Sequence, residues 1–151
     1  MKSLNRREAL VLSAAAGGVL LMTPSDAFAS AGDADKVAKE FSGGKPIMES
    51  KMISLEMPEI AENGNTVPLA ISVESPMTSE NYVKRVVIIS EGNPRPEVAM
   101  FNFSPRSGVA EASTRMRLAK TQNVIAIAEL SDGSLHMTKR QVKVTIGGCG
   151  G

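Results

Sequence analysis

Residues 124–146 read Val124-Ile-Ala-Ile-Ala-Glu-Leu-Ser-Asp-Gly-Ser-Leu-His-Met-Thr-Lys-Arg-Gln-Val-Lys-Val-Thr-Ile146. The Asp132-Gly133 pair inside this run is a strong signal for a tight turn between antiparallel strands. After the turn, Val142, Val144 and Ile146 alternate with polar residues, as expected of a strand with one buried face. The run therefore predicts a β-hairpin whose second strand ends at Ile146, five residues before the end of the sequence.

The sequence upstream of this hairpin contains five further β-rich segments, each bounded by turn signals. They are residues 52–57, 67–75, 82–90, 98–103 and 112–119. About seven strands with short turns and almost no helix predict an all-β fold, an immunoglobulin-like antiparallel β-sandwich over residues 45–146. The sequence has one cysteine and no tryptophan, so the immunoglobulin disulfide and core tryptophan are absent and the likeness is one of fold alone.

One segment of this sandwich is apolar without interruption, at Val86, Val87, Ile88 and Ile89. A continuous apolar run indicates burial on both faces of a strand. Either a partner subunit covers the outer face or the strand lies at the centre of the fold, and the pattern leaves both interpretations open.

Residues 30–44 precede the sandwich and predict a short N-terminal helix or linker. Val37, Ala38 and Phe41 have the spacing of one helix face, and Gly43-Gly44 would end the helix. The single histidine, His136, and the scattered methionines show no metal-ligand pattern, and no cofactor motif is visible. Arg115 and Arg117 are interpreted as a solvated strand face.

The N-terminus has the organisation of an export signal that is cleaved after Ala29. A basic segment containing Arg6 and Arg7 precedes an apolar stretch at residues 9–22 and a small-residue site, Ala27-Phe28-Ala29. The paired arginines indicate the twin-arginine route, although the general secretory route also accepts them. Residues 1–29 are therefore expected to direct the protein to the periplasm, and the apolar stretch is too short for a membrane anchor.

The sequence ends Gly147-Gly148-Cys149-Gly150-Gly151, with its only cysteine among four glycines. Glycine adopts backbone conformations closed to other residues, so residues 147–151 are expected to form a flexible arm. Cys149 lies three residues beyond the last strand and would reach about 10 Å from it. A thiol displayed in this way indicates presentation to partners, and an intermolecular disulfide is the alternative.

Several functions are disfavoured by the residues themselves. The formal net charge is +1, which gives no electrostatic basis for binding nucleic acid or an anionic membrane. No basic residue lies in the arm to lower the thiol pKa, so the thiol should need a partner for activation. A peroxidase would also need a resolving partner for its thiol. A terminal di-glycine carrier would require activation in the cytoplasm, which the export signal argues against.

The chain resembles the SoxY family, the sulfur-compound carriers of the periplasmic Sox thiosulfate-oxidation system. The resemblance covers about residues 41–151 and is strongest at the terminal Gly-Gly-Cys-Gly-Gly. The run Arg115-Met-Arg-Leu-Ala-Lys-Thr-Gln-Asn-Val-Ile-Ala-Ile-Ala-Glu-Leu-Ser-Asp-Gly-Ser134 and the turn Asn63-Gly64-Asn65-Thr66-Val67-Pro68 support it.

This resemblance implies a non-enzymatic carrier that holds thiosulfate-derived sulfur on Cys149. It implies a heterodimer with SoxZ and successive visits to the cytochrome SoxAX, the hydrolase SoxB and, where present, the dehydrogenase SoxCD. Such carriers leave the difficult chemistry to their partners. The alternative is an exported structural subunit whose Cys149 forms an intermolecular disulfide.

Overall fold

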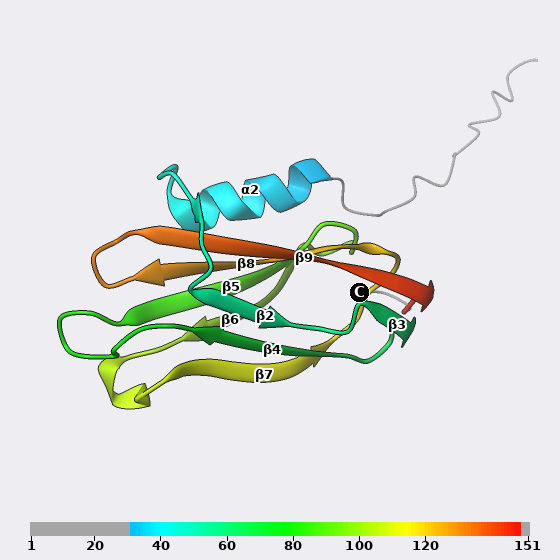
Figure 1. Cartoon of the computed structure of the whole chain (residues 1–151). Coiled ribbons are helices and arrows are strands. Elements are labelled where there is room, and N and C mark those ends of the chain that lie inside the picture. The colour runs from blue at the N-terminus through cyan, green and yellow to red at the C-terminus, as the bar shows by residue number, and fades with distance from the viewer. Residues whose placement is uncertain (1–30, 149–151) are drawn as a thin grey trace, which may run out of the picture.

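The computed structural model describes residues 31–148 of the chain. These residues form nine β-strands, the helix α2 (Ala31–Ser42) and a short 3-10 helix, η1 (Pro105–Ser107) (Figure 1). Two predicted features lie outside the described residues, namely the export signal (Arg6, Arg7 and cleavage after Ala29) and the last arm residues (Cys149, Gly150 and Gly151). Within residues 31–148 no helix is long and apolar enough to cross a membrane.

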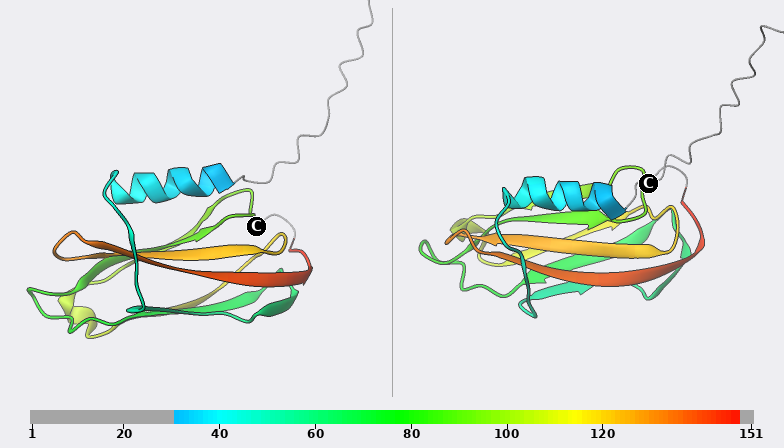
Figure 2. Two further views of the ribbon diagram at one scale, coloured as in Figure 1. Left: turned by 45° about the horizontal axis from the view of Figure 1, so that its top comes forward. Right: turned by 90° about the horizontal axis from the view of Figure 1, so that it is seen from above.

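The strands form two sheets that face each other (Figures 1 and 2). The smaller sheet has the order β2 (Ile53–Glu56), β4 (Val67–Val73) and β7 (Ala110–Met116). The larger sheet has the order β1 (Met48–Glu49), β9 (Leu135–Ile146), β8 (Gln122–Leu130), β5 (Val83–Ser90) and β6 (Glu97–Asn102), and β3 (Ile60–Asn63) also pairs with β9. The predicted all-β sandwich with a short N-terminal helix is therefore confirmed.

The prediction of about seven strands missed two short ones, β1 and β3. Both pair with β9 in the parallel direction, so the sandwich is not antiparallel throughout. Strand β1 has two residues and no buried side chain, and only Ala61 of the four residues of β3 is buried. Segments this short show no alternation, and therefore the sequence pattern could not reveal them.

The main core lies between the two sheets and follows the alternation of the strands. In β4, Val67, Leu69, Ile71 and Val73 are all buried, as their spacing predicts. They meet buried residues of the larger sheet, among them Val86, Ile88, Val124, Ala126 and Val142. Full burial of one such aliphatic side chain contributes about 1.5–3 kcal/mol, so this interface is the main source of stability.

A second, smaller core lies on the opposite face of the larger sheet, beneath α2 (Figure 2). Ala34 and Phe41 of the helix pack against Val87 and Ile89 of β5, together with Ile125, Ile127 and Leu135. The continuous apolar run of β5 is thus buried on both faces within this chain, so a partner is not needed to explain it. The helix ends where the backbone turns at Gly43 and Gly44, both with positive φ.

An ion-pair cluster holds the end of α2 on the sheet. Arg85 Nε donates to Glu129 Oε2 at 2.5 Å, and its Nη2 donates to the carbonyl oxygen of Phe41 at 3.3 Å. The same guanidinium lies 4.4 Å from the centroid of the Phe41 ring. Burial raises the pKa of the Glu129 carboxyl, but hydrogen bonds from Arg85 and Lys84 outweigh it and hold that pKa below its ordinary value.

Candidate functional site

The base of the C-terminal arm, residues 146–148, is the candidate site and is called the arm base below. Strand β9 ends there, at Ile146. Strand β3 runs beside this end of β9, with Asn63 opposite Ile146. The Gly64 N–H then donates to the Ile146 carbonyl oxygen at 2.7 Å. The end of β9 is therefore held on one side by the segment that follows β3 (Figure 1).

The segment after β7 holds the arm base from its other side. Leu118 N–H donates to the Gly64 carbonyl oxygen at 2.8 Å, and Gly148 N–H donates to the Leu118 carbonyl oxygen at 2.9 Å. Nearby, Val144 N–H donates to Thr121 Oγ1 at 2.9 Å. Residues 146–148 thus lie between two segments that are themselves hydrogen-bonded to each other.

Three glycines make this close approach of backbones possible. A Cβ on Gly148 would lie 2.5 Å from the Gly64 carbonyl oxygen, and a Cβ on Gly64 would lie 2.7 Å from the Gly148 nitrogen. A Cβ on Gly147 would overlap the carbonyl oxygen of Ala119. Real Cβ atoms are not found at such distances from backbone atoms, so any other residue would force the three segments apart.

The first half of the arm therefore differs from the flexible segment that the sequence suggests. Gly148 is buried, and its N–H is hydrogen-bonded to the body of the protein. The clustering of glycines predicts a flexible backbone, whereas at Gly147 and Gly148 it permits tight packing. Gly148 is the last residue that the structure describes, and Cys149 follows it directly in the sequence. The reach of about 10 Å expected for the thiol assumed that the chain is free from Ile146 onward, whereas Gly147 and Gly148 are held on the sandwich.

A buried asparagine fixes the segment against which the arm packs. Asn93 is 2% exposed, its Nδ2 donates to the Arg117 carbonyl oxygen at 2.7 Å, and its Oδ1 accepts from Ala119 N–H at 3.0 Å. Oδ1 also accepts from Gln122 Nε2 at 2.8 Å, and Gln122 Oε1 accepts from Gly92 N–H at 2.7 Å. All polar atoms of the Asn93 side chain are thus used to connect the 92–93 turn with residues 117–122.

Basic side chains gather beside this network. Arg95, Arg115 and Arg117 line an open hollow of about 550 Å³, to which Glu97 contributes the one carboxylate. None of the three guanidiniums forms an ion pair within residues 31–148. Arg115 and Arg117 are exposed, in agreement with the interpretation of a solvated face.

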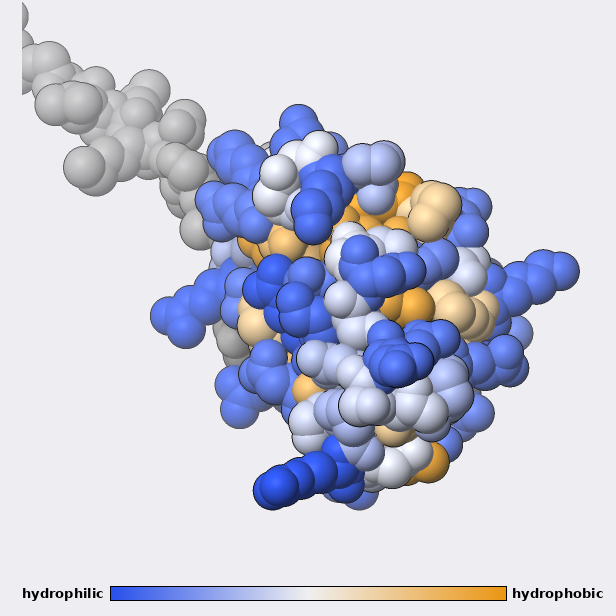
Figure 3. Space-filling model, turned by 90° about the vertical axis from the view of Figure 1, so that its left-hand side faces the viewer, coloured by the Kyte–Doolittle hydropathy of each residue, from blue (hydrophilic) through white to orange (hydrophobic). Residues whose placement is uncertain are grey.

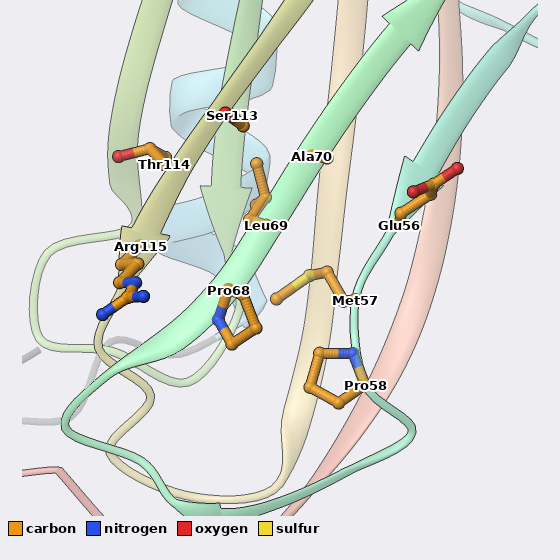
Figure 4. A pocket seen from close by; sticks show the side chains of 9 residues that line it. All are labelled: Glu56, Met57, Pro58, Pro68, Leu69, Ala70, Ser113, Thr114 and Arg115. Carbon is orange, nitrogen blue, oxygen red and sulfur yellow. The ribbon is translucent and has the colours of Figure 1, made fainter.

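Another hollow, about 720 Å³, lies on the outer face of the smaller sheet. Glu56 and Arg115 border it from opposite sides (Figure 4). Its other lining residues are Met57, Pro58, Pro68, Leu69, Ala70, Ser113 and Thr114. No histidine or cysteine lines it.

The opposite end of the sandwich carries other turns, including the 131–134 hairpin. Seen from that end, the surface is largely hydrophilic, with apolar residues showing between the polar ones (Figure 3). His136 lies beyond this hairpin, and its Nε2 is 3.3 Å from Ser134 Oγ. No group of three or more histidine, cysteine, aspartate or glutamate side chains within the described residues could hold a metal ion.

The family model of the sulfur oxidation protein SoxY matches residues 38–149. The chain belongs to the SoxY family. The match ends at Cys149, so it includes the arm base and the cysteine. Among curated proteins, no relative matches this chain.

A solved SoxY structure has the same fold. The sulfur carrier protein SoxY from Chlorobium limicola f thiosulfatophilum is 38% identical to this SoxY-family chain, with a TM-score of 0.66. The match covers 78% of this chain and 100% of that protein. An alignment over the whole of a known family member shows that the sandwich described here is the SoxY fold.

Two superoxide reductases show how far the same sandwich extends beyond the SoxY family. Neelaredoxin from Ignicoccus hospitalis is 17% identical with a TM-score of 0.55, covering 78% of this chain and 95% of that one. A putative superoxide reductase from Thermotoga maritima is 19% identical with a TM-score of 0.52, covering 69% of this chain and 89% of that one. At this level of identity the likeness concerns the fold alone.

The sequence pattern points to Cys149 and its glycines but does not reveal the groups that hold the arm base. Gly64 was visible only as part of an Asn-Gly-Asn turn, and Asn93 only as part of a loop. Neither position carries a periodic signal, because each acts through backbone atoms of a distant segment. The four glycines were the one available sign that backbones approach closely here.

Proposed function

We propose that this protein is a periplasmic carrier that holds thiosulfate-derived sulfur covalently on Cys149 and presents it to the enzymes of sulfur oxidation. The observation that supports this most is the SoxY family match, which extends through Cys149. The related protein from Chlorobium limicola f thiosulfatophilum is itself named a sulfur carrier. Cys149 directly follows Gly148, whose N–H is bonded to the sandwich, and this place in the sequence suits a thiol that partners must reach.

The proposed loading step joins the Cys149 thiol to thiosulfate. The thiol and one thiosulfate dianion form a cysteine S-thiosulfonate, with release of one proton and two electrons. The cytochrome SoxAX is the proposed electron acceptor. SoxB would then add water across the terminal sulfur–sulfur bond, which releases sulfate and two protons and leaves a persulfide anion on Cys149. SoxCD, where present, would oxidise the outer sulfur of that persulfide to a sulfonate, with oxygen from three waters, and would accept the six electrons as six protons are released.

The proposal includes export and a partner subunit. Residues 1–29 would be removed after Ala29, with Arg6 and Arg7 directing the twin-arginine route, and the mature protein would pair with SoxZ. In this role the chain is not an enzyme, and neither hollow of the sandwich takes part in the chemistry. Gly147 and Gly148 would hold the arm base, while Gly150 and Gly151 would complete the segment that enters a partner.

Intact-mass measurement tests the carrier role directly. After incubation of the mature protein with SoxZ, SoxAX and thiosulfate, wild type should gain the mass of one thiosulfate-derived group. The Cys149→Ser variant should gain none while keeping the wild-type melting temperature. An equal adduct on the variant would place the sulfur elsewhere. A permanent disulfide-linked dimer in place of the adduct would favour the structural-subunit alternative.

A further inference from the structure

We propose that Gly64 and Asn93 are positioning residues for the carrier thiol, because together they fix Gly148, the residue that directly precedes Cys149. This inference rests on the proposed function for its purpose, although the contacts that carry it do not. Neither residue belongs to the arm, and both act through backbone atoms of residues 117–119 and 146–148.

Gly64 makes direct hydrogen bonds to the arm base and to the segment after β7. Its N–H donates to Ile146 and its carbonyl oxygen accepts from Leu118, so one peptide unit connects the end of β9 to the segment after β7. Gly148 then donates to the Leu118 carbonyl oxygen, which closes the set of three segments. Because a Cβ on Gly64 would lie 2.7 Å from the Gly148 nitrogen, this geometry requires glycine at position 64.

Asn93 acts on the arm base indirectly, through the segment after β7. Residues 117–119 receive the arm base on one edge through Leu118, and they receive Asn93 on the other edge through Arg117 and Ala119. Alternate residues of an extended segment present their backbone groups to opposite edges. Asn93 is therefore placed to hold the segment without touching the arm, and its complete burial makes its hydrogen bonds hard to replace with water.

The consequence for the carried group follows from the length of the remaining chain. With Gly148 fixed, the Cα of Cys149 lies about 3.8 Å from that of Gly148, whatever conformation the arm adopts. A partner must then dock against the end of the sandwich formed by residues 63–65, 93–95 and 117–121. A fixed starting point lowers the ordering cost of each delivery, because less of the arm must be immobilised on docking.

A spin label on Cys149 measures this positioning without any partner enzyme, since Cys149 is the only cysteine. In wild type the nitroxide should show a slow, restricted component, and hydrogen exchange at the Gly148 amide should be at least about tenfold slower than in an unstructured peptide. In Gly64→Ala, the restricted component should be lost and the protection of Gly148 should disappear. In Asn93→Ala, both should change in the same direction but less.

Two control variants separate positioning from general loosening. Gly108→Ala adds a methyl group where no atom lies within 4 Å, and its positive φ strains the backbone far from the arm. Asn123→Ala removes a hydrogen bond to Glu91 at the same end of the sandwich without touching residues 117–119. Both should keep the restricted label and the protected Gly148 amide even where they lower the melting temperature.

The outcomes distinguish this inference from the carrier function on which its purpose rests. A fully mobile label and an unprotected Gly148 amide in wild type would overturn the positioning role, even if Cys149 is loaded with sulfur. Equal loosening by the control variants would also overturn it. If the label is restricted as expected but Cys149 accepts no sulfur, the positioning contacts stand and the carrier function fails. If the positioning role and the carrier function are both correct, Gly64→Ala should slow loading of Cys149 by SoxAX severalfold. Alkylation of Cys149 by a small reagent should be unchanged.

Discussion

Two regions of this protein are attached to the sandwich by opposite means. The helix α2 is held by side chains, with Phe41 and Ala34 buried against Val87 and Ile89. The arm base is held by main-chain hydrogen bonds and by the absence of side chains at Gly64 and Gly148. Apolar side chains tolerate small displacements, whereas hydrogen bonds between backbones fix position. The helix that covers the sheet therefore depends on bulky side chains, and the arm base depends on a fixed backbone geometry.

The largest effect that tests this contrast is expected at Phe41. Phe41→Ala should lower the free energy of unfolding by about 3 kcal/mol, because it removes a buried ring and its contact with Arg85. Urea denaturation of the mature protein measures this loss. Protection of the Gly148 amide should be retained in the folded fraction, because α2 packs on β5 and its neighbours whereas the Gly148 N–H is bonded to Leu118. A loss below about 0.5 kcal/mol would show that α2 contributes little to the fold.

The sequence predicted the helix and its buried face, but it did not predict that Gly147 and Gly148 are packed. Both results have one physical reason. Burial of a side chain leaves a periodic apolar pattern, as Val67–Val73 and Val37, Ala38 and Phe41 show. Close approach of two backbones leaves only a glycine, which looks the same as a glycine that is free. The sequence therefore predicted the sandwich and named Cys149, but it could not distinguish packed Gly147 and Gly148 from a flexible linker.

The missed parts of the fold have the same origin. Strand β3 contributes one buried side chain, and its role is to bring Gly64 beside the end of β9 through parallel pairing. Asn93 is a polar residue in a loop, a position where asparagine is common for local reasons. Only the three-dimensional structure shows that its hydrogen bonds reach a segment 24 and 26 residues further along the chain.

A smaller loss of stability is expected from a substitution near the arm base, and it should leave α2 unaffected. Asn93→Ala should lower the free energy of unfolding by about 1–3 kcal/mol, because it leaves the Arg117 carbonyl and the Ala119 N–H without their buried partner. Hydrogen exchange resolved by residue should locate the loosening at residues 117–122 and Gly148, with α2 unchanged. Loosening spread evenly over the sandwich would mean that Asn93 supports the fold as a whole.

The smallest effect concerns pH and belongs to the helix side alone. The pKa of Glu129 is lowered in the folded state because hydrogen bonds from Arg85 and Lys84 outweigh its burial. A carboxyl with a lowered folded-state pKa adds stability above its unfolded pKa, near 4.5, and loses that contribution as pH falls through the folded-state value. Glu129→Gln should therefore reduce the loss of melting temperature between neutral pH and acid.

Asp132, whose pKa the Ser134 hydroxyl lowers, remains in both proteins, so the difference between wild type and Glu129→Gln isolates Glu129. If the arm base is held independently of α2, Gly148 protection should be the same in both proteins at each pH where they are folded. A pH-dependent loss of Gly148 protection that the substitution abolishes would couple the two regions through the sheet. The contrast between a side-chain attachment and a backbone attachment would then describe two parts of one cooperative unit.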